Sequence, residues 1–192
     1  MKELKDMSLE ELWQLFPIIL KEHNPEYDTW YREEKQHLLH LLDGYDICRI
    51  NHIGSTSVKE LVAKPIIDIL LELSAACDID QAAELLRQNG WIVMAQNNAD
   101  KTLDLNKGYT PGGFAEKVFH LHIKPYGDWN ELYFRDYLQQ HSKAAREYEA
   151  LKLGLKEQYE HNRDAYTDAK SQFVSEYTEK ARREYPNRYL PL

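Results

Sequence analysis

Apolar residues recur at helical spacing near both ends of the chain and form shorter runs between them. The helical spacing predicts helices over residues 8–22, 27–42 and 80–89, and an almost continuous helical region from residue 129 onward. Ser8 and Glu11 form a capping box for the first helix, and Gly90 ends the third. In the last region only Gly154 interrupts a sequence of good helix formers. Residues 185–192 contain two prolines and are expected to form an irregular tail.

The shorter runs predict strands over residues 46–52, 65–73, 91–95, 102–109 and 115–123. The turn residues 110–113 separate the last two. Strands followed by helices predict an α+β core with C-terminal helices. A length of 192 residues fits one domain over 1–192. We expect N-terminal helices over 1–45, an α/β core over 46–125 and a helical part over 126–192.

Composition excludes several classes of protein. A formal net charge of −8 argues against an extended nucleic-acid surface, although a local cationic pocket remains compatible with it. Cys48 and Cys77 form neither a Cys-x-x-Cys pair nor a disulfide framework, which fits a reducing cytosol. No apolar run approaches about 18 residues and the N-terminus is acidic, so neither a membrane span nor a signal peptide is expected. The sequence therefore predicts a soluble, cytoplasmic protein and leaves the oligomeric state open.

Asp68 is the one charged residue in the apolar strand run from Pro65 to Leu71. Burying an unpaired carboxylate would cost several kcal/mol or shift its pKa. We therefore expect a cationic group to meet Asp68.

Gly54, Ser55, Thr56 and Ser57 form a turn of small polar residues ahead of this strand. If the turn opens a helix, its backbone N–H groups and hydroxyls lie at the positive end of the helix dipole and suit a phosphate. It lacks the residues of a P-loop and of a dinucleotide-binding motif. The alternative is that its Ser and Thr residues only cap the helix.

Strict alternation in residues 119–123 places His120 and His122 on one face of a strand and apolar side chains on the other. Their α-carbons are about 6.6 Å apart, which suits a metal-binding or proton-transfer pair. The alternative is a face that is merely solvated.

The segments HIGSTSV and KPIIDI together resemble the signature of the GrpB family. The resemblance extends over residues 24–175, through NPEYDTWYREEKQHLLHLL, HLHI, FRDYL, YEALK and YTDAK. It implies a nucleotidyltransferase-like fold, with a mixed sheet flanked by helices. In that superfamily a Gly-Ser turn, here Gly54 and Ser55, holds a nucleoside triphosphate, and an Asp-x-Asp pair binds divalent metal. Similar domains also occur fused to dephospho-CoA kinases, which implies coenzyme or nucleotide metabolism.

The chain departs from this pattern at Leu70, where the second metal carboxylate would stand. Glu72 lies about 13 Å along the strand from Asp68 and cannot easily replace it. Restoring Asp at position 70 is expected to strengthen metal binding if the superfamily geometry survives. Lys59 and Glu60 replace a common Pro-Gly pair, so we expect a different helix start and a local charge pair.

The resemblance implies a site in which Asp68, His120 and His122 are catalytic, because the histidine strand falls where the superfamily places its third acidic residue. It implies Mg²⁺ or Mn²⁺, held by Asp68 and His122. The implied nucleotide or phosphate contacts are Gly54, Ser55, Thr56, Ser57, Lys64, Arg135 and Lys152. Helical spacing pairs Tyr148 with Lys152 and Tyr166 with Lys170, although lysines on such helices are often only solvated.

Three functions remain open at this stage. The first is an enzyme that transfers a nucleotidyl or phosphoryl group from a nucleoside triphosphate to an unknown acceptor. The second is a non-catalytic protein that binds a nucleotide or phosphorylated small molecule. The third is a scaffold in which Asp68 only satisfies Lys64 or a backbone turn.

Overall fold

The computed structural model describes residues 2–191. At its centre is a five-stranded sheet in the order β1-β2-β5-β4-β3. Its strands are β1 (Ile47–Ile53), β2 (Ile67–Leu73), β3 (Ile92–Asn97), β4 (Thr102–Thr110) and β5 (Gly113–Pro125). β2 and β5 are parallel and the other neighbouring strands are antiparallel. The predicted strands are confirmed, with small shifts at their ends.

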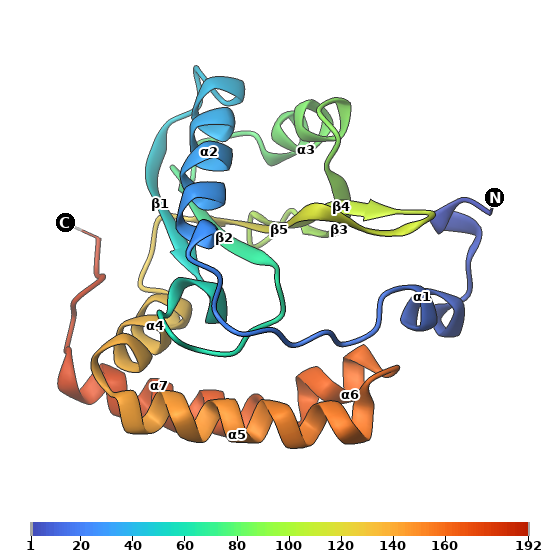
Figure 1. Ribbon diagram of the computed structural model, residues 1–192. Coiled ribbons are helices and arrows are strands. Elements are labelled where there is room, and N and C mark those ends of the chain that lie inside the picture. Colours follow the sequence, from blue (N-terminus) through green and yellow to red (C-terminus); the bar gives the residue numbers. More distant parts are fainter. Residues whose placement is uncertain (1, 192) are drawn as a thin grey trace.

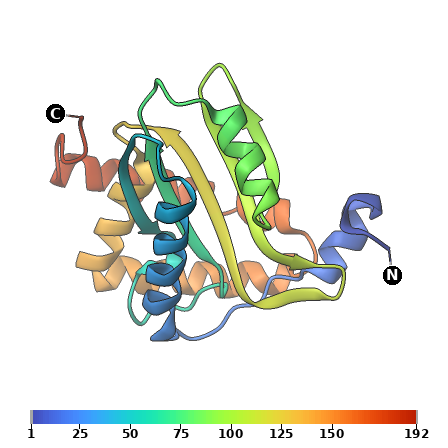
Figure 2. The same cartoon turned by 90° about the horizontal axis from the view of Figure 1, so that it is seen from above.

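Helices cover both faces of this mixed sheet (Figure 1). They are α1 (Leu9–Leu15), α2 (Glu26–Leu41), α3 (Ile79–Gln88), α4 (Asn130–Gln140), α5 (Ser142–Tyr159), α6 (Arg163–Asp168) and α7 (Ser171–Glu184). Helices α2 and α3 lie on one face, and α4 to α7 lie on the other (Figures 1 and 2). The predicted α+β fold with C-terminal helices is confirmed. No helix within the described residues is long and apolar enough to cross a membrane.

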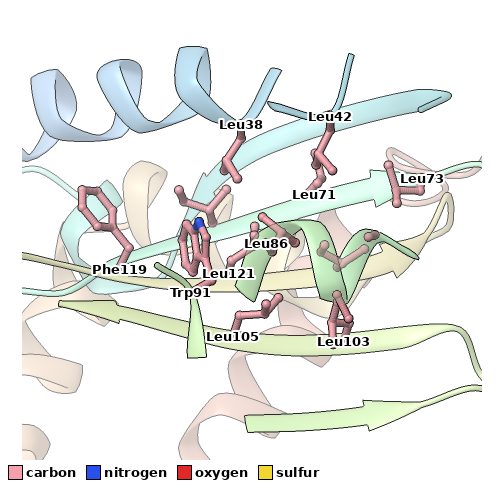
Figure 3. Close-up of a cluster of buried hydrophobic side chains, with 14 of the residues drawn as sticks. Leu38, Leu42, Leu71, Leu73, Leu86, Trp91, Leu103, Leu105, Phe119 and Leu121 are labelled. Carbon is pink, nitrogen blue, oxygen red and sulfur yellow. The ribbon is translucent and has the colours of Figure 1, made fainter. Parts of the chain in front are cut away.

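The main hydrophobic core fills the space between the sheet and the pair α2 and α3 (Figure 3). Alternate residues of β2 supply its centre, including Ile69 and Leu71, which are fully buried. Leu38 of α2 and Leu86 of α3 pack onto them. The opposite face of the same strands therefore carries the polar residues, among them Asp68.

Two helix predictions were too long. Helix α1 ends at Leu15 and not near residue 22, because Pro17 disfavours a helical conformation at Phe16, where φ is −122° and ψ is 65°. The region after residue 129 is broken into four helices, and Gly154 lies inside α5 without interrupting it. One of the breaks is fixed by Asn162, whose side chain accepts a hydrogen bond from the backbone of Ala165 and caps α6.

Strand pairing puts one row of side chains on the polar face of the sheet. Asp68 pairs with Ile53 of β1 on one side and with His120 of β5 on the other. His120 pairs in turn with Asn106 of β4, and Asn106 pairs with Ile92 of β3. Directly paired residues point to the same face, so this row crosses the whole sheet beneath the C-terminal helices.

Candidate functional site

The Gly54–Ser57 turn contains a single 3-10 turn over Ser55–Ser57 and no α-helix. The prediction that it opens a helix was wrong, so no helix dipole acts here. The chain becomes extended directly after the turn, at Val58, where φ is −104° and ψ is 116°. Within the described residues, Lys59 and Glu60 do not form the expected ion pair with each other.

The hydroxyls of the turn have different roles. Thr56 donates to the carbonyl of Ile66 at 3.0 Å, and Ser57 donates back to the carbonyl at the start of the turn at 2.6 Å. These two hydroxyls hold the turn in place. The Ser55 hydroxyl faces the cavity described below and accepts a hydrogen bond from Lys152 at 3.1 Å. Of the three hydroxyls, that of Ser55 is therefore placed to donate to a ligand.

A cationic group was expected to meet Asp68, and the side chain that hydrogen-bonds to Asp68 is that of His120. Its Nδ1 lies 3.0 Å from Oδ1 of Asp68. On the other side of the ring, Nε2 lies 2.8 Å from the hydroxyl of Tyr109 and 3.1 Å from the guanidinium of Arg163. Arginine can only donate, so Nε2 accepts and Nδ1 carries the proton to Asp68. Burial lowers the pKa of His120, which agrees with a neutral ring in this position.

Asp68 stays ionised in this setting. Burial raises its pKa, but the hydrogen bond from His120 and the neighbouring cationic groups, Lys64 among them, outweigh burial and hold the pKa at about 2. The site therefore contains a carboxylate that is charged throughout the neutral pH range.

His122 is oriented by Asp104 of β4. Its Nδ1 lies 2.7 Å from Oδ1 of Asp104. Burial lowers the pKa of His122, but the hydrogen bond to Asp104 and the nearby negative charges outweigh burial and raise the pKa above its ordinary value. No hydrogen bond within residues 2–191 uses Nε2. A histidine held by a carboxylate at one nitrogen presents the other in a fixed direction, as metal-binding histidines do.

Asp68, His120 and His122 converge to form one potential metal site. One ligand atom from each lies within 4.8 Å of the others. Because β2 and β5 run parallel with Asp68 opposite His120, all three side chains emerge on the same face. The structure thus brings together the three residues that the sequence had selected.

A cavity of about 740 Å³ opens above these residues, between the sheet and helices α4 to α7. Lys64, Lys152 and Lys170 line it, together with Arg163. Burial is the largest cause that lowers the pKa of the three lysines, to about 7 for Lys64 and Lys152 and to about 8 for Lys170. Neighbouring cations lower these values further. The cavity is therefore strongly cationic when the lysines are protonated.

Two predicted phosphate contacts lie outside the cavity. Arg135 pairs with Asp136 and also contacts the side chains of Asn51 and Tyr189, so its guanidinium is occupied. Ser57 likewise does not line the cavity. Gly54, Ser55, Thr56, Lys64 and Lys152 do line it.

Sequence reasoning missed Arg163 entirely. It begins α6, and no spacing in the sequence connects it with His120. Lys170 was detectable through its helical spacing from Tyr166, and its ammonium group does lie 4.4 Å from the centre of that ring. Arg163 comes from the C-terminal helices, whose packing onto the sheet depends on long-range contacts.

Neither of the other candidate carboxylate positions contributes to the site. Glu72 is fully buried and forms an ion pair with Arg49, with N–O distances of 2.5 and 2.7 Å. Leu70 is fully buried against Ile53 and Leu132. Asp68 is therefore the only carboxylate that β2 directs into the cavity.

Two buried hydroxyls that line the cavity lack a hydrogen-bond partner. They are the phenol of Tyr166 and Oγ1 of Thr178. Both hydroxyl oxygens have almost no accessible surface, so they are not open to the cavity in this structure.

The sequence and the fold match known proteins of one family. A family model described as GrpB protein matches residues 17–180. The Glutamate-rich protein GrpB of Alkalihalophilus pseudofirmus is 35% identical over 163 residues, which cover 83% of this chain and 92% of that protein. The UPF0157 protein YqkA of Bacillus subtilis is 32% identical over 164 residues, which cover 84% of this chain and 46% of YqkA. The chain thus spans about half the length of YqkA.

Solved structures give a consistent picture. The crystal structure of the conserved protein GrpB from Enterococcus faecalis has a TM-score of 0.74 and 28% sequence identity, and the match covers 87% of this chain and 99% of that chain. A structure of the Cid1 poly(U) polymerase with MgGTP bound is similar at a lower level, with a TM-score of 0.48, 13% identity and coverage of 79% and 46%. The match to the family model and the curated relatives show that this chain belongs to the GrpB protein family.

Proposed function

We propose that the cavity binds a nucleoside triphosphate with a divalent metal ion, and that the protein transfers a nucleotidyl or phosphoryl group to an acceptor. The observation that carries this proposal is the group of cations in the cavity. Lys64, Lys152, Arg163 and Lys170 line it, and within residues 2–191 none of them forms an ion pair with a carboxylate. A ligand with several negative charges complements such a group.

The energetics favour the same ligand class. Placing uncompensated ammonium groups in a buried site is unfavourable, and the lowered pKa values of the lysines express that cost. A bound triphosphate would restore the charged form of each lysine through charge-assisted hydrogen bonds. The charges of the buried lysines are therefore balanced only when an anion is bound in the cavity.

The helical wall of the cavity fits the rest of such a ligand. Thr178 lies on α7 and Tyr166 on α6, and both line this wall. Phe134 and Tyr148 add apolar surface to it. The ring of a ribose or base would pack on these aromatic residues.

The potential metal site fits a transition ion better than magnesium. Mg²⁺ prefers oxygen ligands in octahedral geometry, whereas Asp68 and His122 offer one carboxylate and one imidazole. Mn²⁺ accepts this mixed set. Asp68 and His122 are the primary ligands in the proposal, because His120 already uses both ring nitrogens. When bound, the ion would stabilise negative charge on phosphoryl oxygens as a Lewis acid.

In the proposed transfer an oxygen of the acceptor forms a bond to a phosphorus of the triphosphate. The bond from that phosphorus to the bridging oxygen breaks, and pyrophosphate or a nucleoside diphosphate leaves with the electron pair. Lys152 and Arg163 would stabilise the charge that develops on the phosphate oxygens, and Ser55 would donate a hydrogen bond.

A second candidate function is binding without catalysis. Leu70 favours it, because the position of the second superfamily carboxylate is filled by apolar packing. In that case the cations would bind a nucleotide or phosphorylated small molecule without need of metal. Dependence on metal separates the two candidates.

Thermal unfolding with each of the four ribonucleoside triphosphates, with and without Mn²⁺ or Mg²⁺, tests the proposal. A ligand at about 100 times its dissociation constant adds about 2.7 kcal/mol to the free energy of unfolding. A metal-dependent shift that Asp68→Ala abolishes supports the enzyme. A shift of equal size without metal supports the binder. No shift with any triphosphate contradicts the enzyme and the nucleotide binder, and leaves only a phosphorylated small molecule as the ligand.

A further inference from the structure

A second cavity, of about 530 Å³, lies on the same face of the sheet, on the side of β3 and β4. Its walls come from the N-terminal segment and from the exposed face of these two strands. His120, His122 and Arg163 line both this cavity and the cationic one. The potential metal site therefore stands between two cavities. We call the second one the apolar groove.

The strand register explains why the groove reaches the site. Ile92 lies at the far end of the cross-strand row that runs through Asn106 and His120 to Asp68. Neighbouring strands are about 4.8 Å apart, so three strand spacings put Ile92 about 14 Å from Asp68. A molecule of ordinary metabolite size can span that distance.

The groove is unusually apolar for exposed surface. Within residues 2–191, five large apolar side chains are exposed. Three of these five line the groove, namely Leu9, Ile92 and Met94, with exposed fractions of 50%, 38% and 58%. Trp13 and Phe16 contribute aromatic surface. Clustered exposed apolar residues beside polar ones indicate a binding surface.

We propose that the apolar groove binds the apolar body of the acceptor, a small amphipathic molecule whose hydroxyl reaches Asp68 and His122. In this arrangement the triphosphate binds in the cationic cavity and the acceptor binds in the apolar groove. The hydroxyl oxygen forms the new bond to phosphorus, its proton passes to solvent, and the triphosphate loses pyrophosphate or a nucleoside diphosphate. This inference rests on the proposed function for its chemistry, while the ligand class rests on the groove itself.

A binding experiment with 4-phenyl-1-butanol as the probe tests the groove. Saturation-transfer NMR would measure its binding to the wild type, to Met94→Glu and to Leu153→Glu. Leu153 is the matched control, an exposed apolar residue of α5 that does not line the groove. A carboxylate in the groove should weaken binding about tenfold or more, whereas the control should bind like the wild type. Equal binding to Met94→Glu, or equally strong binding of glycerol to the wild type, overturns the proposal.

The same samples test whether the groove binds a second copy of the chain and not a small molecule. If the groove is an interface between copies, size-exclusion chromatography will show a wild-type dimer that Met94→Glu converts to a monomer, and this result also overturns the proposal. A wild type and variant of equal size support it.

Added Mn²⁺ tests the acceptor role separately from the nucleotide site. The paramagnetic ion should broaden the carbinol CH₂ resonance of the bound probe more than its ring resonances. Asp68→Ala should abolish this difference and leave saturation transfer intact. Equal broadening of both groups in a wild type that binds Mn²⁺ overturns the proposed orientation. The probe could bind with selective broadening while no triphosphate shifts the unfolding temperature. That combination would contradict the proposed function and would still support the groove and the orientation of the probe in it.

Discussion

Gly54 lies so close to Asp68 that a Cβ atom at position 54 would stand 2.2 Å from Oδ2 of the carboxylate. The turn and the strand thus meet at Asp68, the carboxylate that β2 directs into the cavity. Gly54 also has a φ of 69°, which side chains disfavour. The glycine is required for two independent reasons, close approach and backbone conformation.

Gly54→Ala should therefore displace Asp68 and abolish the response to metal and triphosphate in thermal unfolding. The backbone strain alone should lower the free energy of unfolding by about 1 kcal/mol or more. Gly154→Ala is the matched control, because a Cβ at that position in α5 meets nothing within 4 Å. The control should raise stability by about 0.5–1 kcal/mol and keep the ligand response. An unchanged metal response in Gly54→Ala would contradict the role of the close contact.

Lys152→Met should stabilise the free protein at pH 6 by about 1–3 kcal/mol, since it removes a buried ammonium without a carboxylate partner. The pKa of Lys152 is about 7 in the folded protein, below its ordinary value of 10.5. The unfolded chain therefore binds more protons between these values, and the lysine penalises folding fully below pH 7 and progressively less as pH rises to 10.5. Urea unfolding at pH 6 and pH 9 measures the difference in stability between Lys152→Met and the wild type.

The advantage of Lys152→Met should shrink at pH 9. Lys143→Met is the control, because Lys143 lies on the same helix with its side chain 87% exposed. That variant should change stability little at either pH. A Lys152→Met protein less stable than the wild type at pH 6 would show that the hydrogen bonds of Lys152 to Ser55 and to the carbonyl of Val62 outweigh the cost of its burial.

Asp104→Ala should weaken Mn²⁺ binding about 10- to 100-fold, because Asp104 orients His122 from outside the ligand set. Loss of the free Mn²⁺ signal in electron paramagnetic resonance measures the affinity. Asp43→Ala, at an exposed position after α2, serves as the control and should bind Mn²⁺ like the wild type. If Asp104→Ala binds as tightly as the control, His122 does not ligate the ion.

Leu70→Asp should destabilise the protein by about 2–4 kcal/mol, because the new carboxylate would be buried against Ile53 and Leu132. The sequence alone suggested that this change restores a metal ligand. Leu70 packs beneath α4 and does not line the cavity, so the new carboxylate is not expected to reach an ion there. Urea unfolding with and without Mn²⁺ distinguishes the two views, since a variant that Mn²⁺ returns to wild-type stability would support the restored ligand.

The sequence was most informative where a local pattern decides the geometry. The two-residue period of a strand was sufficient to place His120 and His122 on one face, and the lone charge in the run from Pro65 to Leu71 was sufficient to predict a partner for Asp68. Both inferences needed only the alternation of side chains across a strand.

The sequence was least informative where distant segments meet. Arg135 was expected in the site, but its guanidinium is held by Asp136 beside it and by Tyr189. Tyr189 reaches Arg135 because the C-terminal tail folds back onto α4. Arg163 reaches the site only because α6 packs beside Tyr109 of β4. The expected helix after Ser57 does not form, because the chain is already extended at Val58.

Calorimetric titration of ATP into the protein with Mn²⁺ at pH 7 tests the central claim most directly, with Lys152→Met beside Lys143→Met. We expect ATP to bind to the wild type and to Lys143→Met, and to bind about tenfold or more weakly to Lys152→Met, because one charge-assisted contact disappears. Equal affinity in all three proteins would contradict the claim that the buried cations of the cavity bind the triphosphate.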